Sequence, residues 1–284
     1  MNIDLKQMFN TYRRNPFSFV MRLLLVLSIT FTVGMLAFIL IYILTKGIPY
    51  LTPALFSFEY TSENVSMMPS IITTLMLVAV SLLISLPFGI FTAVYLVEYA
   101  PKGSKIVEII RLTTETLSGI PSIVYGLFGN IFFVTTLGWK YSFAAGVMTI
   151  SIMILPLIMR TAEEALISVP DDWRQASFGL GAGRLRTVFR VVLPSAVPGI
   201  LSGVILAVGR VVGETAALIY TLGTMAQIPN SFFSSGRTLA LHMWVLTGEG
   251  LHINQAYATA VVLIVLVVGI NALSGFVAKK LSKV

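Results

Sequence analysis

Six long stretches of the chain contain no charged residue and consist mostly of apolar side chains. Each approaches the roughly 20 apolar residues with which an α-helix crosses the hydrocarbon core of a bilayer. Prolines and polar residues trim their ends, so the pattern predicts membrane-spanning helices near 22–44, 69–96, 118–138, 141–160, 196–220 and 256–278. The predicted fold class is therefore all-α, a polytopic membrane protein with six transmembrane helices.

Composition supports this interpretation and excludes several kinds of site. The chain is 56% hydrophobic and 11% charged, whereas soluble domains carry about 25% charged residues. There is no cysteine and there are only two histidines, so we expect no disulfide, no thiolate nucleophile and no metal site. The first apolar stretch is too long for a signal peptide and lacks a small-residue cleavage site, so we expect it to remain as a span.

The net charge of +7 is distributed as expected for a membrane protein rather than for a nucleic-acid binder. With six spans, 15 Lys or Arg residues fall on the side that holds both termini, and three, Lys46, Lys140 and Arg237, fall on the other side. Because positive loops stay in the cytoplasm, both termini are predicted to be cytoplasmic. No nucleic-acid partner is expected.

The chain is organised as one membrane domain. We expect a cytoplasmic N-terminal segment at 1–21, a six-helix domain at 22–278 and a cytoplasmic tail at 279–284. The predicted loops are 97–117 and 161–195 on the inner side and 46–68 and 221–255 on the outer side. A phosphate-cradling GxxxxGK[ST] loop is absent from the sequence. If ATP drives the process, another chain must bind it.

The long inner loop, 161–195, is predicted to fold as two short helices joined by the glycine-rich "GLGAG" at 179–183. Apolar or small residues recur at helical spacing in each half. They are Trp173, Ala176, Ser177 and Leu180, then Leu185, Val188, Phe189 and Val192, with Arg184, Arg186 and Arg190 off the second stripe. Such a pair could lie flat on anionic lipid or dock on another protein, and periodicity does not choose between them.

This loop resembles the cytoplasmic motif of importer permeases in the ABC transporter superfamily, which reads Glu-Ala-Ala, three residues, Gly, nine residues, Ile-x-Leu-Pro. The matching positions here are Gln175, Ala176, Ser177, Gly181, Leu193 and Pro194. The resemblance implies a coupling helix that fits a groove on an ATPase subunit. Gln175 stands where the motif has glutamate, so one charged contact with the ATPase is missing from the pattern.

Arg210 and Glu214 stand within the fifth apolar stretch, "GVILAVGRVVGETAAL" at 203–218. Arg210 lies about 20 Å of helix beyond Pro194, where a charge facing lipid costs at least about 2.5–3.5 kcal/mol. Glu214 is four residues further on, so both are predicted to share one helix face that points into the bundle or a pathway. They could form a purely structural ion pair.

Alternatively the two charges form an anion site, because a guanidinium binds an oxyanion through two hydrogen bonds. The carboxylate of Glu214 would then either accept a hydrogen bond from a protonated anion or release Arg210 when the anion arrives. Both roles remain open from the sequence.

The same stretch, with its Gly-Glu-Thr-Ala, resembles the fifth-span signature of phosphate ABC transporter permeases. The segment "SGRTLALHMWVLTGEG" at 235–250 resembles the PstA type rather than its sister permease, PstC. The resemblance covers about 70–278 and implies the type I ABC importer permease fold. Its implied substrate-pathway residues are Arg210, Glu214 and Thr215, with Arg237 on the outer side, where a solvated loop charge is the alternative.

The resemblance implies a non-catalytic subunit that imports inorganic phosphate across the cytoplasmic (inner) membrane of a bacterium. Implied partners are a second permease of the PstC type, a dimer of ATPase subunits that bind the ATP, and an extracytoplasmic phosphate-binding protein. No cofactor is expected on the chain itself. Alternative hypotheses are a permease for another oxyanion such as molybdate or sulfate, a self-sufficient secondary anion transporter, and a membrane scaffold with a structural ion pair.

Overall fold

The computed structural model describes residues 16–101 and 103–281, and every α-helix in these ranges runs as follows. The order is α2 (Pro16–Gly47), α3 (Met68–Val94), α4 (Lys105–Ser118), α5 (Ser122–Gly129), α6 (Phe143–Ile167), α7 (Asp171–Gly179), α8 (Arg184–Thr187), α9 (Leu193–Val212), α10 (Ala216–Ile219), α11 (Leu239–Glu249) and α12 (Ile253–Leu281). Most of the expected N-terminal segment and the last three residues of the tail lie outside the described residues.

Shorter turns of other helix types connect or extend these helices. Two are 3-10 turns in the first outer loop, η1 (Ile48–Tyr50) and η2 (Pro53–Phe56). Three are π-helical: η3 (Tyr95–Tyr99) continues α3, η4 (Asn130–Thr136) continues α5, and η5 (Val188–Val192) joins α8 to α9.

Five helices are long and apolar enough to span a membrane, and a sixth span exists if a bent pair is counted as one. The pair consists of α4 and the combined α5–η4, which meet at an angle of 100°. The third span was expected over 118–138, after a loop at 97–117. Instead α4 occupies much of that loop, and the chain turns before Pro121, since proline disfavours a helical residue before it.

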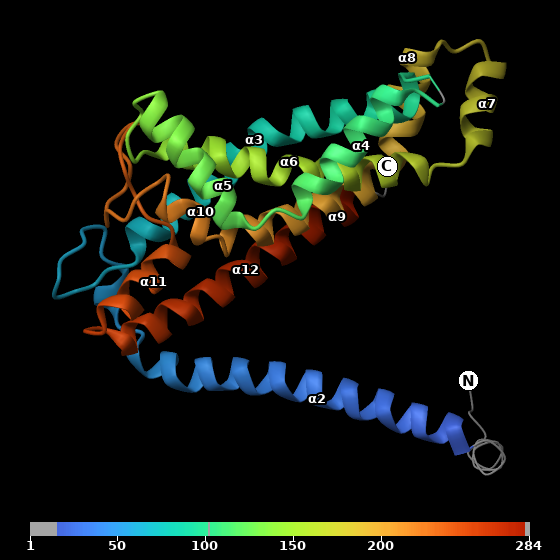
Figure 1. The fold of residues 1–284 in the computed structure, drawn as a ribbon. Coiled ribbons are helices and arrows are strands. Elements are labelled where there is room, and N and C mark those ends of the chain that lie inside the picture. Colours follow the sequence, from blue (N-terminus) through green and yellow to red (C-terminus); the bar gives the residue numbers. More distant parts are fainter. Residues whose placement is uncertain (1–15, 102, 282–284) are drawn as a thin grey trace.

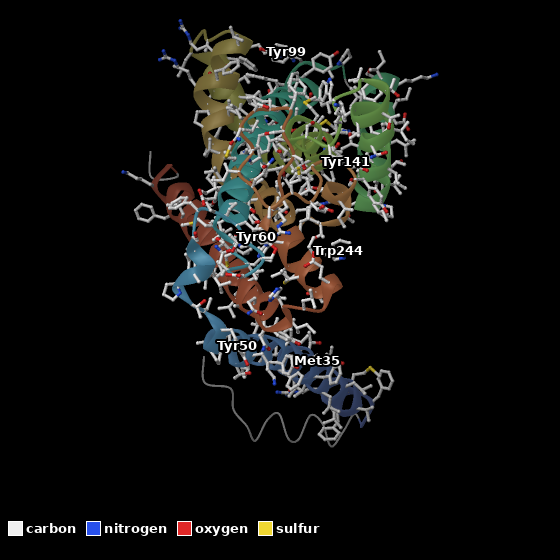
Figure 2. All side chains as sticks on the ribbon, turned by 90° about the vertical axis from the view of Figure 1, so that its left-hand side faces the viewer. Met35, Tyr50, Tyr60, Tyr99, Tyr141 and Trp244 are labelled. Carbon is white, nitrogen blue, oxygen red and sulfur yellow. The ribbon has the colours of Figure 1, made fainter. Side chains whose placement is uncertain are left out.

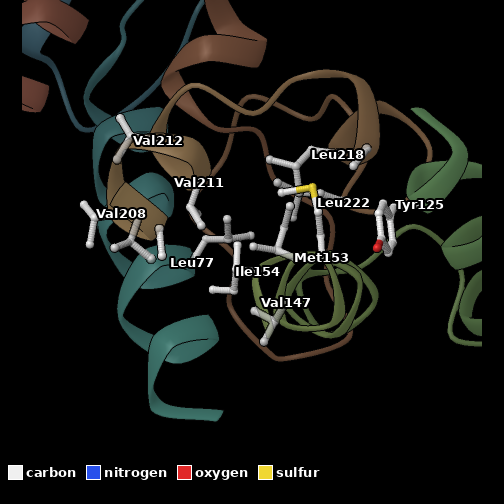
Figure 3. Close-up of a cluster of buried hydrophobic side chains, with 14 of the residues drawn as sticks. Leu77, Tyr125, Val147, Met153, Ile154, Val208, Val211, Val212, Leu218 and Leu222 are labelled. Atoms are coloured by element: carbon white, nitrogen blue, oxygen red, sulfur yellow. The ribbon is translucent and has the colours of Figure 1, made fainter. Parts of the chain in front are cut away.

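The centre of the bundle is formed by α3, α6 and α9, with α12 packed on α9. Leu77 of α3, Ile154 of α6 and Val211 of α9 are fully buried in one apolar cluster (Figure 3). This cluster holds one face of α9 against the bundle. The opposite face of α9 is left for whatever lies outside these helices.

Helix α2 stands apart from the bundle (Figure 1). No residue in its apolar window is buried, and Figure 2 shows its side chains, including Met35, around a separate rod. Its outer end packs against α12, where Tyr42 meets the edge of Tyr257 with ring centroids 5.9 Å apart. A Cβ on Gly47 would come within 2.4 Å of the Tyr257 carbonyl oxygen, so the glycine permits this contact.

The expected fifth span at 196–220 differs from the structure at both ends. The helix begins earlier, because α8, η5 and α9 form one continuous rod over Arg184–Val212 rather than a separate short helix and a span. Pro194 lacks the N–H that would bond to the carbonyl four residues before it, and the π-helical turn η5 directly precedes it. The helix then ends at Val212, well before residue 220.

The two ends of the molecule carry different features. The turns after α2, the turn between η4 and α6, and the segment before α11 gather at one end, and α7 projects from the other (Figure 1). The first residues of α2 and the last of α12 lie at the α7 end, as expected for an even number of crossings. Within the expected outer loop at 221–255 the chain forms α11, which the sequence pattern did not predict.

Candidate functional site

A break in the fifth span forms the centre of the candidate site. After Val212 the chain leaves the helix for Gly213, Glu214 and Thr215, then makes the single turn of α10. Irregular backbone at membrane depth is tolerated where it is buried in protein or lines a water-filled cavity. Gly213 is exposed in this subunit, so the break lies on a face that this chain does not cover.

Arg210 lies in the last turn of α9, on the face of the helix that points away from the core. Its neighbours on that face are Ser202, Leu206 and Gly213, all exposed, whereas Val211 is buried. Arg210 itself is half-buried. Among the residues that the structure describes, no carboxylate lies within 4.0 Å of its guanidinium, so its charge is available to an outside group.

Glu214 does not share a helix face with Arg210, which corrects the prediction from their spacing. The helix ends two residues before Glu214, so the four-residue spacing no longer sets the direction of its side chain. Glu214 is buried, 8% exposed, and its Oε1 accepts a hydrogen bond of 3.0 Å from the N–H of Ala217. It therefore caps the turn of α10, and the two charges are not ion-paired in this structure.

Helix α5 fixes the position of the break from behind. A Cβ on Gly126 would lie 2.7 Å from the Cα of Ala217, so only glycine lets α10 approach this closely. The amide of Asn130 donates a 2.8 Å hydrogen bond to the carbonyl of Tyr220. Thr215, half-buried, lies between Glu214 and this anchored turn. The site is thus a loop on rigid supports.

Tyr125 of α5 lies on the same side of the bundle as the break (Figure 3). Its hydroxyl donates a 2.8 Å hydrogen bond to the carbonyl of Leu117 at the end of α4. The charge of Arg210 reaches Tyr125 electrostatically. The bend between α4 and α5 is therefore tied to the region of Arg210, a connection that the sequence pattern did not indicate.

This arrangement can bind an anion. A lone guanidinium offers five N–H donors in a planar fork, and a charged side chain inside a membrane span marks a substrate or ion pathway by default. Broken helices also provide ion sites in transporters, because their free backbone groups face the break. Arg210, the exposed break and Thr215 have this geometry, and Glu214 supplies a carboxylate beside it.

Arg237 is placed differently from both sequence-based interpretations. It is 3% exposed, so it is not a solvated loop charge, and its guanidinium carbon lies 4.7 Å from the centroid of the Tyr60 ring. Its Nε and Nη2 atoms are buried without a hydrogen-bond partner, and burial lowers the pKa of its guanidinium. In this structure Arg237 fastens the first outer loop to the segment before α11 and is closed to an arriving anion.

The coupling-loop residues divide into an exposed group and a structural group. Gln175 and Ala176 are exposed on α7, beside Trp173, which is 51% exposed. The hydroxyl groups of Ser177 and Thr187 lie 2.8 Å apart and join α7 to α8. The exposed apolar side of α7 is what either lipid contact or protein docking requires.

Gly181 ends α7 with a left-handed backbone angle, φ +83°. Its N–H bonds to the carbonyl of Phe178 and the N–H of Ala182 bonds to that of Ser177, the pattern of a Schellman motif. Leu193 packs against the cluster below the loop, and Pro194 begins α9. The motif glycine and proline therefore shape the loop, whereas Gln175 and Ala176 present its surface.

Sequence reasoning missed a buried ion pair beneath this loop. Arg174 of α7 contacts Glu98 in η3 at 2.8 Å. A carboxylate at the inner end of the second span, on the side that carries most of the basic residues, was the available signal.

Solved structures similar to this fold are ABC transporters. A bacterial alginate ABC transporter in complex with an alginate pentasaccharide-bound periplasmic protein matches with a TM-score of 0.70 at 15% identity, covering 96% of this chain and 98% of that chain. The MetNI methionine ABC transporter in an inward-facing conformation matches with a TM-score of 0.61 at 20% identity, covering 75% and 93%. These likenesses show the type I ABC importer permease fold.

Curated relatives are more similar in sequence. A probable ABC transporter permease protein, YqgI of Bacillus subtilis (strain 168), is 40% identical over 185 residues, which are 61% of this chain and 63% of that protein. The phosphate transport system permease protein PstA 1 of Mycobacterium tuberculosis (strain ATCC 25618 / H37Rv) is 35% identical over 70% of this chain and 65% of its own length. The match thus spans a little under two thirds of these relatives.

A third relative is covered more fully. The phosphate transport system permease protein PstA of Pasteurella multocida (strain Pm70) is 36% identical over 217 residues, which are 72% of this chain and 76% of that protein. Residues 85–283 match the family described as binding-protein-dependent transport system inner membrane component. The chain therefore belongs to that family of ABC importer permeases, in the branch that includes PstA.

Proposed function

We propose that the chain is the permease subunit of an ATP-driven importer that carries inorganic phosphate across the inner membrane of a bacterium into its cytoplasm. The observation that carries this proposal is Arg210, a cation without a carboxylate partner among the described residues, on the uncovered face of α9 beside a helix break. The phosphate transport names of the PstA relatives support the choice of cargo.

The chemistry of the site fits a protonated oxyanion. The guanidinium of Arg210 can hold two oxygens of one anion. An ionised carboxylate only accepts hydrogen bonds, so Glu214 favours an anion that still carries a proton, such as hydrogenphosphate, and repels fully ionised sulfate. Glu214 already accepts one hydrogen bond, from Ala217, and its position beside the break puts it near the proposed path.

The partners follow from the uncovered surfaces. A second, related permease of the PstC type would face the open side of α9 and complete the cavity around Arg210. A dimer of ATPase subunits would bind the ATP and receive α7, with one copy beneath each permease. An extracytoplasmic phosphate-binding protein would dock at the opposite end. The chain would move substrate without covalent chemistry or a cofactor of its own.

In this mechanism, ATP binding closes the ATPase dimer and draws the coupling helices together, which opens the permease pair outward. The binding protein then releases phosphate toward Arg210, and hydrolysis of ATP returns the cavity to the inward-facing state. Two discrete arrangements of the helices provide the alternation that transport requires.

The test is uptake of labelled phosphate and labelled sulfate into vesicles that contain the assembled complex, with the wild-type chain, Arg210→Ala and Arg210→Lys. We expect ATP-dependent uptake of phosphate alone. Arg210→Ala should assemble and hydrolyse ATP without uptake, because no cation faces the anion. Arg210→Lys should keep partial uptake, since it retains the charge and loses the planar fork. Normal uptake by Arg210→Ala would disprove the site, and equal entry of sulfate would disprove the cargo.

A further inference from the structure

The coupling helix is fastened to a membrane helix that is distant from it in sequence. Arg174 lies on α7, and Glu98 lies in the π-helical turn η3 at the inner end of the second span. The Nε and Nη2 atoms of Arg174 both donate to Oε1 of Glu98, at 3.0 and 2.8 Å. The two side chains are 13% and 7% exposed. The pair is therefore shielded from water, unlike most ion pairs at protein surfaces.

The same guanidinium also binds the end of α6. Nη2 donates to the carbonyl of Leu166 at 2.9 Å and Nη1 to that of Val169 at 2.6 Å. Carbonyls at the end of a helix have no partner within the helix, so Arg174 satisfies groups that would otherwise be unpaired. One side chain thus joins α7 to the inner ends of both α3 and α6.

A second contact leads from the coupling loop to the same π-helical turn. The guanidinium carbon of Arg184 lies 5.5 Å from the centroid of the Tyr99 ring, next to Glu98 in the sequence. Arg184 itself is exposed. Residues on both sides of the glycine-rich turn therefore hold η3.

Helix α7 depends on these polar contacts for its orientation. None of its residues is buried, so apolar packing contributes little to holding it. It is linked to the bundle through 168–170 on one side and through the glycine-rich 180–183 on the other. Without Arg174, a force on α7 could turn the helix about these two links before it moved the bundle.

We propose that the Glu98–Arg174 pair is a positioning contact that makes the coupling helix a rigid extension of α3 and α6, so that force on α7 moves the membrane helices. The inference rests on the proposed function, in which α7 receives movement from an ATPase. Neither residue touches the substrate. Their role is to keep ATP hydrolysis linked to transport.

The first test measures uptake and ATP hydrolysis together in vesicles that contain the complex with Glu98→Gln. We expect uptake per ATP hydrolysed to fall by roughly tenfold, which corresponds to a loss of about 1.4 kcal/mol of coupling, while the complex still assembles and hydrolyses ATP. The double variant Glu98→Gln/Arg174→Gln should be no worse than the poorer single variant, because both changes remove one contact.

The matched control is Glu164→Gln, which makes the same chemical change in the exposed pair Arg160–Glu164. These side chains are 56% and 63% exposed, and both lie in α6. Uptake per ATP should be unchanged in this variant. An equal loss in Glu164→Gln, or an unchanged ratio in Glu98→Gln, would overturn the proposal.

The second test does not depend on the cargo. The chain has no cysteine, so spin labels can be placed on Asp172→Cys in α7 and Leu83→Cys in α3 alone, both exposed positions. We expect a narrow distance distribution with Glu98 present and a clearly broader one with Glu98→Gln. A distribution that stays narrow would contradict the proposal. A complex that imports no phosphate but still shows the broadening would disprove only the proposed cargo.

Discussion

At the scale of single residues, backbone angles explain part of the coupling motif. Gly181 has φ +83°, a conformation that costs other residues about 1–2 kcal/mol. A side chain there would meet no neighbour within 4 Å, so the need for glycine comes from the backbone and not from crowding. The motif glycine is thus a structural requirement of the turn between α7 and α8.

Gly181→Ala should therefore lower the free energy of unfolding by about 1–2 kcal/mol. The measurement is denaturant unfolding of the purified chain in detergent. Gly179→Ala is the control, because Gly179 lies at the end of α7 with equally open space and no positive φ. We expect it to be neutral or slightly stabilising. Equal losses in both variants would show that the backbone angle is not the cause.

His242 provides a pH-dependent prediction. It lies in α11, outside the membrane-spanning helices, is fully buried and meets the Tyr60 ring edge-on, with centroids 6.2 Å apart. Burial, and secondarily the charge of Arg237, lower the pKa of His242 from 6.5 to about 3. The folded protein therefore keeps this imidazole neutral where the unfolded chain protonates it.

Stability should consequently fall as the pH drops below about 6.5, because only the unfolded state gains the proton. Between pH 6.5 and 5 the contribution of His242 amounts to about 2 kcal/mol. His242→Phe keeps an aromatic ring at this position and should show a shallower fall in unfolding free energy over this range. The control is His252→Phe. Parallel pH profiles for wild type and His242→Phe would contradict the prediction.

Arg210 and Glu214 show how far sequence reasoning reaches at this scale. Two charges in an apolar stretch identify the site, because lipid cannot accept them. Their relative direction could not be predicted, since it depends on where the helix ends. The burial of Arg237 was also beyond reach, because Tyr60, which covers it, lies on a distant loop.

At the scale of elements, the long apolar helices were predictable and the breaks between them were not. The spans near 69–96, 141–160 and 256–278 correspond to α3, α6 and α12, where apolar residues run without interruption. Gly213 ends α9, yet a helix tolerates an isolated glycine, so the pattern indicated continuity. Helices α4 and α11 lie in expected loops because they are short and partly polar.

The close approach of α5 and α10 leads to a prediction about the break. Gly126→Ala would place a Cβ 2.7 Å from the Cα of Ala217 and 3.1 Å from two backbone oxygens, so α10 must move. We expect a loss of about 1–3 kcal/mol in stability and a strong loss of uptake, because Glu214 caps the displaced turn.

The control for this prediction is Gly119→Ala. A Cβ on Gly119 would find its nearest atom, the carbonyl oxygen of Thr116, at an ordinary 3.5 Å. We expect its stability and uptake to remain near those of the wild type. If Gly126→Ala behaved in the same way, α10 would not be held by this contact.

At the scale of the whole molecule, the distribution of charge predicts an orientation that can be measured directly. The end that carries α7 is also the end with most Lys and Arg residues, and we expect it to face the cytoplasm. Asn230→Cys, in the segment before α11, should react with a membrane-impermeant maleimide in intact cells. Arg186→Cys, in α8, should react only after permeabilisation. The reverse pattern would contradict the orientation.

Helix α2 has a consequence for the life of the protein in the cell. Its apolar window buries no residue against its own chain, and its outer end is anchored on α12. A newly made copy therefore reaches its final shape only when a neighbour or ordered lipid occupies the space beside this helix. We expect unassembled copies to present α2 to membrane proteases, so that the cell keeps the amount of this subunit in step with that of its partners.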